Sequence, residues 1–247
     1  MEYQAKWIIF LGHFKISQTI VVSWIIMAFL AICSYLLTRN LKEKPESKKQ
    51  VLLEYAYISL RNMVTQTMGE NFVSRVPDIV SYIGSLFLFF LLSNWAPLFG
   101  LRSPTTDLDT TMAWALITVG MIYVMGVRFK GASYFKEFLE PTPLMLPLNI
   151  IGEIARPISL SFRPFGNILG GSIIMALFYK LLGFISGFIP MYNIQIGQFA
   201  IPVPLHLYFD IFAGTLQAFI FIMLTMVFVG SVADGIDTAD GVDSGEK

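Results

Sequence analysis

An arginine stands inside a long apolar stretch in the second half of the chain. Arg163 has mostly uncharged neighbours for about ten residues on either side, apart from Arg156 and Glu153. An arginine cannot lose its proton to lower the cost of leaving water, because its guanidinium stays protonated throughout the pH range of proteins. If this stretch crosses a membrane, the charge costs about 2.5–3.5 kcal/mol near the helix centre. Arg163 must then face a water-filled cavity, a carboxylate or a partner subunit, whereas Arg156 lies near enough to a basic loop to reach the interface.

Small and polar residues surround Arg163 along the same expected helix. Asn167 lies one helical turn further on and points in roughly the same direction. Gly166 and Gly170 have small-xxx-small spacing, which lets a second helix approach closely, either from this chain or from another. Pro164 removes one backbone donor and predicts a local kink at the arginine.

A second polar stripe lies in the last apolar stretch of the chain. Asp210, Gly214 and Gln217 follow one another at spacings of four and three, which places them on one helix face. A carboxylate inside a membrane is by default a functional site, although a solvated position at the extracytoplasmic end explains Asp210 equally well. Gln217 lies deeper. We expect the two stripes to face each other, with Arg163 near Gln217, and with Asp210 and Ser172 toward one end.

The composition indicates an integral membrane protein. Of the 247 residues, 55% are hydrophobic and only 14% are charged, about half the charged share of a typical soluble domain. The 22 Phe and 10 Tyr exclude a disordered chain. Equal numbers of basic and acidic residues, 17 of each, argue against a nucleic-acid-binding protein. The single cysteine, Cys33, excludes a disulfide framework, and His13 and His206 are too few for haem ligands in pairs.

Three stretches predict membrane-spanning helices, since a span needs roughly 20 apolar residues. They are residues 16–38, 79–101 and 110–127. Residues 39–77 combine a basic loop with an amphipathic helix, which we expect at the membrane surface. The basic loops that follow the first and third spans indicate the cytoplasmic side. Residues 1–15 then form an extracytoplasmic N-terminus, and no cleaved leader is predicted.

The remaining apolar sequence predicts a long helical hairpin. Its helices cover about 144–180 and 203–232, joined by an irregular extracytoplasmic loop, and residues 234–247 form a cytoplasmic tail. The expected fold is therefore an all-α polytopic membrane protein, a single membrane domain over 1–247. It has about five membrane-inserted helices and one amphipathic surface helix. We find no internal repeat, so an inverted-repeat transporter is not supported.

Four strings resemble those of subunit a of F-type ATP synthases. In chain order they are Gly84-Ser-Leu-Phe-Leu-Phe with Leu92-Ser-Asn94, Pro104-Thr-Thr-Asp-Leu-Asp-Thr-Thr111, Arg156-Pro-Ile-Ser-Leu-Ser-Phe-Arg-Pro-Phe-Gly-Asn-Ile-Leu-Gly-Gly171, and Thr215-Leu-Gln-Ala-Phe-Ile-Phe-Ile-Met-Leu-Thr225. Each string alone is a weak signal. Together they run in order from roughly residue 16 to 230, which makes the resemblance specific.

The resemblance implies a stator subunit of a rotary motor that carries ions to and from a ring of c subunits. By family analogy, Arg163 is the essential ion-translocation arginine, which faces the ring carboxylate. Asn167 and Gln217 line the same seam. Glu153 lies on the cytoplasmic approach, and Asp210 takes the place of an ionisable residue in the extracytoplasmic half-channel. No catalytic site of its own, cofactor or resident metal is expected, and no G-x-x-x-x-G-K-[ST] string is present.

Two residues depart from the family pattern. Ser172 stands where relatives commonly have Glu or His, and Pro164 stands where an aliphatic residue is usual. Without a titratable group at Ser172, a proton relay depends on Asp210 and water, or the transported ion differs. The coupling ion, H⁺ or Na⁺, is thus left open, with a slight preference for a sodium ion that passes transiently near Asp210 and Ser172.

The same resemblance implies the partners and the location. The partners are the c-subunit ring, a b-type peripheral stalk, the F1 sector through that stalk and the lipid bilayer, but no nucleic acid. A bacterial plasma membrane is expected, with the N-terminus extracytoplasmic and the C-terminus cytoplasmic. The alternative is a standalone ion or anion permease that uses Arg163 as its substrate site. A purely structural membrane anchor would not explain the presence of Arg163 and Gln217 in apolar helices.

Overall fold

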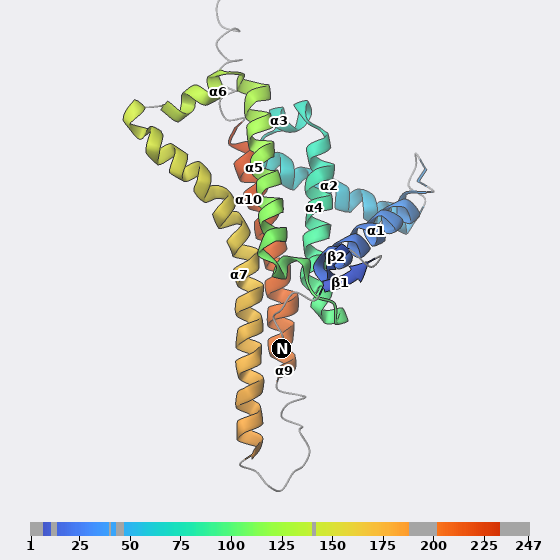
Figure 1. Ribbon diagram of the computed structural model, residues 1–247. Helices are drawn as coiled ribbons and strands as arrows, with labels where there is room; N and C mark the ends of the chain where they lie inside the picture. The colour runs from blue at the N-terminus through green and yellow to red at the C-terminus, as the bar shows by residue number, and fades with distance from the viewer. Residues whose placement is uncertain are drawn as a thin grey trace, which may run out of the picture.

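The computed structural model describes residues 7–10, 14–39, 41–42, 47–139, 142–187 and 202–232 (Figure 1). Its elements, in chain order, are β1 (Trp7–Phe10), β2 (Phe14–Ser17), α1 (Gln18–Thr38), α2 (Lys48–Met68), α3 (Glu70–Arg75), α4 (Asp78–Trp95), η1 (Ala96–Phe99), η2 (Pro104–Thr106), α5 (Leu108–Lys130), α6 (Ser133–Lys136), η3 (Glu137–Leu139), η4 (Pro143–Met145), α7 (Leu146–Gly187), α9 (Pro202–His206), the π-helical η5 (Leu207–Ala213) and α10 (Gly214–Gly230). Within the described residues, five helical stretches are long and apolar enough to cross a bilayer. The fold is that of an all-helical, multi-pass membrane protein.

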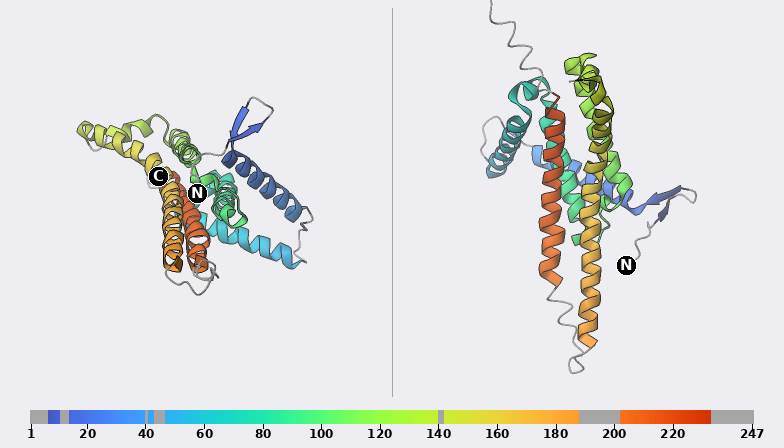
Figure 2. Two further views of the ribbon diagram at one scale, coloured as in Figure 1. Left: turned by 60° about the horizontal axis from the view of Figure 1, so that its bottom comes forward. Right: turned by 90° about the vertical axis from the view of Figure 1, so that its left-hand side faces the viewer.

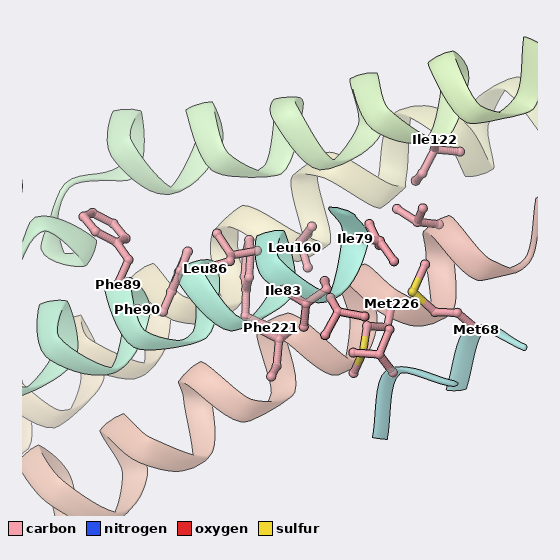
Figure 3. Packing of buried hydrophobic residues seen from close by; sticks show 14 of the residues in the cluster. Met68, Ile79, Ile83, Leu86, Phe89, Phe90, Ile122, Leu160, Phe221 and Met226 are labelled. Carbon is pink, nitrogen blue, oxygen red and sulfur yellow. The ribbon is translucent and has the colours of Figure 1, made fainter. Parts of the chain in front are cut away.

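The hydrophobic core lies between α4, α5 and α10 (Figure 3). Phe90 of α4 stacks on Phe221 of α10, with 4.1 Å between the ring centroids. Ile83, Ile122 and Met226, one from each of these three helices, are fully buried nearby. Burial of each such side chain stabilises the fold by about 1.5–3 kcal/mol. The three helices therefore form one packed unit, which α7 contacts through α5 and α10.

The longest element, α7, exceeds what a perpendicular span requires. Its 42 residues correspond to about 63 Å at 1.5 Å per residue, against a hydrocarbon core about 30 Å thick. In a membrane α7 must therefore tilt strongly or extend beyond the lipid. The helix continues through Pro157 and Pro164. Its C-terminal part runs beside α9 and α10, and its N-terminal part leans away from them (Figures 1 and 2).

Two helices, α1 and α2, project from the bundle (Figures 1 and 2). The start of α1 is held where Thr19 donates a hydrogen bond to Asp107 (2.7 Å), which also accepts from Arg102 (2.8 Å). The end of α2 packs closely on α10, because a Cβ atom at Gly230 would lie 3.2 Å from Met68 Cα. Most of the apolar side chains along α1 are exposed, as a lipid-facing helix requires.

A short β-hairpin precedes α1, which the sequence analysis did not predict. β1 and β2 pair antiparallel, from Trp7 opposite Ser17 to Phe10 opposite Phe14. The pairing of the two strands gives hydrogen-bond partners to backbone N–H and C=O groups. A run as short as β1 could not pair these groups within a helix of its own. The irregular loop expected within the hairpin falls mainly on residues 188–201, and the expected tail on 234–247. Both lie outside the described residues.

Candidate functional site

Arg163 lies on an outward face of α7. Its side chain is exposed and makes no hydrogen bond or ion pair with another described residue. The face around it is built from small residues: Ser159 lies one turn earlier, and Gly166 and Gly170 follow. A Cβ atom added at either glycine would meet no atom of another element within 4 Å. The guanidinium is thus presented on a surface that no other described element of this chain covers.

Arg156 lies two turns earlier on α7 and is satisfied within the chain. Its Nη1 is 2.7 Å from Glu153 Oε1, and its guanidinium stands 5.8 Å from the ring centroid of Phe228. The hydroxyl of Tyr123 donates to Glu153 Oε2 at 3.4 Å. Glu153 and Arg156 help to line a cavity of about 390 Å³ between the ends of α5 and α10 and the start of α7. Its other polar lining residues are Lys130, Tyr134, Asn149 and Ser231.

Two asparagines hold the last helix in place. Asn167 of α7 donates from Nδ2 to the carbonyl of Ala213 at 3.4 Å, and Asn94 of α4 donates to the carbonyl of Gly214 at 2.8 Å. The hydroxyl of Thr105 in turn donates to Asn94 Oδ1 at 2.8 Å. The buried Asn94 amide is therefore bonded on both sides. Because η5 changes into α10 at these two carbonyls, the asparagines fix the junction between the two kinds of helix.

Asp210 lies in the middle of the π-helical η5. Short π-helical stretches are rare and frequently occur at functional sites. Because a π-helix turns less per residue than an α-helix, Asp210 is rotated away from the stripe that α-helical spacing predicts. Gly214 and Gln217 are buried, whereas the side chain of Asp210 is 24% exposed. The expected stripe is therefore interrupted at η5, and Asp210 faces a different neighbour.

That neighbour is a histidine that is hydrogen-bonded to a side chain of α7. His206 Nδ1 lies 2.8 Å from Asp210 Oδ2, and the hydroxyl of Tyr179 lies 3.0 Å from His206 Nε2. The sequence analysis counted His206 but gave it no role, although its i, i+4 spacing to Asp210 is a readable signal. Tyr179 gave no signal, because it meets His206 only when the two arms of the hairpin pack together.

Gln217 faces the interior of the bundle. It is only 4% exposed, and its Nε2 has no hydrogen-bond partner among the described residues. Arg163 is on the outward face of α7, and no hydrogen bond joins the two described side chains. We expected Arg163 to lie near Gln217, but the two side chains form no direct hydrogen bond within this chain.

Comparison with known proteins supplies the family. The family model of the ATP synthase A chain matches residues 20–230. The chain belongs to this family. It is similar to the ATP synthase subunit a, sodium ion specific, of Propionigenium modestum, with 37% identity over 239 residues that cover 90% of this chain and 76% of the relative. The resemblance carried by the four strings is confirmed.

As a subunit a, the protein is an ion-translocating, multi-pass membrane component of the F-type ATP synthase and associates with other subunits of that enzyme. Its Ser172 lies on α7 next to the π-helical stretch. The Ser172 hydroxyl donates to the carbonyl of Leu169 at 2.8 Å. A Cβ atom at the adjacent Gly171 would lie 3.1 Å from the ring of Phe209, so the two helices approach closely here. Ser172 and Asp210 are thus the chain neighbours of Gly171 and Phe209, the two residues at which α7 and η5 approach each other.

Proposed function

We propose that Arg163 is the residue of this stator that faces the carboxylates of a rotating c-subunit ring. The observation that carries the proposal is the exposed guanidinium on the small-residue face of α7, which has no counter-charge among the described residues. A permanent cation at membrane depth needs such a counter-charge. Gly166 and Gly170 allow a partner helix to come close enough to bring one.

The mechanism follows from the effect of the Arg163 charge on a nearby carboxylate. An opposite charge nearby favours the ionised form of a carboxylate. A ring carboxylate that reaches Arg163 therefore releases its ion and cannot bind another while the two are paired. Rotation of the ring separates the pair, and the carboxylate then takes up an ion from a second aqueous route. Arg163 thus drives ion release and prevents a leak between the two routes.

Two half-channels supply these routes in our proposal. The extracytoplasmic route passes the contact between α7 and η5, where Asp210 and Ser172 lie, with Asn167 and Gln217 closer to the seam at Arg163. The cytoplasmic route begins at the cavity that Glu153 helps to line. Moving one charge across 100 mV supplies about 2.3 kcal/mol, so several ions must pass for each ATP formed.

We also propose the partners, the location and the coupling ion, with support from the family and the relative. The partners we propose are the c-ring, a b-type peripheral stalk and, through the stalk, the F1 sector. The location is a bacterial plasma membrane, with the N-terminus extracytoplasmic and the C-terminus cytoplasmic. Sodium is the coupling ion that we propose, because the relative is described as sodium ion specific and Ser172 offers no titratable group. The family match favours the stator over a standalone permease.

The test replaces Arg163 in the complete ATP synthase, reconstituted in vesicles. We expect Arg163→Ala to abolish ATP-driven ion pumping while the complex still assembles. Arg128→Ala is the matched control, because Arg128 is an exposed arginine in the last turn of α5, away from the proposed seam. Its pumping should equal that of the unmodified complex. Normal coupled pumping by the Arg163→Ala complex rejects the proposed role.

A further inference from the structure

Asp210 is held at one oxygen by a chain of two hydrogen bonds that begins on the other arm of the hairpin. Tyr179 lies on α7, His206 ends α9, and Asp210 lies in η5. The contacts measure 3.0 Å from Tyr179 to His206 and 2.8 Å from His206 to Asp210. The side chain of His206 is 44% exposed, and that of Asp210 is 24% exposed. The chain therefore joins the two arms, and both polar side chains remain partly exposed on the surface of this subunit.

The chemistry of Asp210 fixes the role of each atom. An ionised carboxylate only accepts hydrogen bonds, so His206 must carry a hydrogen on Nδ1 to bond Asp210 Oδ2. A neutral imidazole then has its lone pair on Nε2, and that atom accepts from the hydroxyl of Tyr179. With Asp210 ionised and His206 neutral, this tautomer satisfies both contacts. His206 is thereby fixed as a donor toward Asp210.

This arrangement leaves the second carboxylate oxygen for another partner. Asp210 Oδ1 has no hydrogen-bond partner among the described residues, whereas Oδ2 is held by His206. In η5 and in residues 173–187 of α7, the other charged or titratable groups are Lys180, which follows Tyr179 and is exposed, and Tyr208, which packs on Phe209 and Phe212. Neither lies in the chain of contacts to Asp210.

We propose that His206 is a positioning residue of the extracytoplasmic ion path, which holds Asp210 Oδ2 so that Oδ1 faces the passing ion. The inference rests on the proposed role of Asp210 and extends it to two residues that neither the family match nor the relative assigns. His206 supplies the hydrogen bond, and Tyr179 selects the tautomer that can donate it. The contact requires a hydrogen-bond donor at the Nδ1 position of His206. A side chain that does not titrate can also provide such a donor.

Three substitutions at His206 separate these contacts in the complete, reconstituted enzyme. His206→Asn keeps a donor near the Nδ1 position but loses the contact with Tyr179. His206→Gln keeps a polar group near the Nε2 position but loses the donor to Asp210, and His206→Ala loses both. ATP synthesis is measured while sodium chloride is varied on the extracytoplasmic side, with a parallel series in which the external pH is varied. Copurification of the other subunits shows that each variant has assembled.

We expect His206→Ala and His206→Gln to raise the ion concentration for half-maximal synthesis by roughly five- to tenfold, with a smaller change in the maximal rate. His206→Asn should restore it to within about twofold, and Tyr179→Phe should fall between these values. An unchanged half-maximal concentration in His206→Ala overturns the inference. So does a His206→Asn enzyme as defective as His206→Ala, because the ring itself would then be required. The proposed function fails separately, by normal pumping in Arg163→Ala.

Discussion

Two arginines on one helix show how the surroundings decide the role of a charge. Arg156 contacts the carboxylate of Glu153 and the ring of Phe228, so its charge is compensated within the chain. Arg163, seven residues later, is exposed and has no such partner among the described residues. The first arginine is suited to shaping the cavity at one end of α7. The second is suited to pairing with a carboxylate from another subunit, and this difference was not visible from residue type alone.

At the same scale, Asp210 and Gln217 should differ in their effect on transport. We expect Asp210→Asn to slow sodium-driven ATP synthesis by more than tenfold, because the amide cannot bind a cation as a carboxylate does. Gln217→Ala should slow it less, since Gln217 is buried and its Nε2 has no described partner. The rate is measured in vesicles with a sodium gradient at constant external pH. Equal losses in the two variants, or synthesis that is independent of sodium, would contradict this prediction.

At the scale of elements, the junction between η5 and α10 should depend on Asn94. Asn94→Ala leaves the Thr105 hydroxyl and the Gly214 carbonyl without this buried partner, which costs about 1–3 kcal/mol. We expect a lower midpoint of thermal unfolding for the purified complex. Asn62→Ala is the control, because Asn62 is exposed on α2, and its midpoint should not change. Equal midpoints for both variants would show that Asn94 does not hold the junction.

The structure at the junction between η5 and α10 could not be predicted from the sequence. Arg163 could be singled out because its charge is permanent and its neighbours are apolar, two properties that need no coordinates. The spacing of Asp210, Gly214 and Gln217 gave a stripe only on the assumption of α-helical winding throughout. No local pattern in residues 207–213 predicts a π-helix, and the asparagines that bond the carbonyls of Ala213 and Gly214, where η5 meets α10, come from distant helices. The contact between Tyr179 and His206 was hidden for the same reason.

At the scale of the whole molecule, the bundle has two exposed apolar surfaces of different character. Along α1 the exposed residues are large and apolar, as lipid contact requires. Along α7 the exposed face also carries Arg163 between small residues, so lipid alone would leave the guanidinium without a counter-charge. α5 and α10, which belong to the core, lie beside α7 and contact it (Figure 1). The exposed face of α7 is therefore the surface that we propose for the partner.

Cross-linking can show which partner occupies that face. Cys33 is first replaced by serine, because it is the single native cysteine. Ser159→Cys then places a thiol one turn from Arg163, and Val124→Cys places one on α5, where the side chain is 63% exposed. Each thiol is labelled with benzophenone maleimide in the complete enzyme and illuminated. On the proposed docking of the ring along the small-residue face, we expect the probe at position 159 to form an adduct with the c subunit and the probe at position 124 to form none. Ring adducts of equal yield at both positions, or none at position 159, would mean that the ring docks elsewhere.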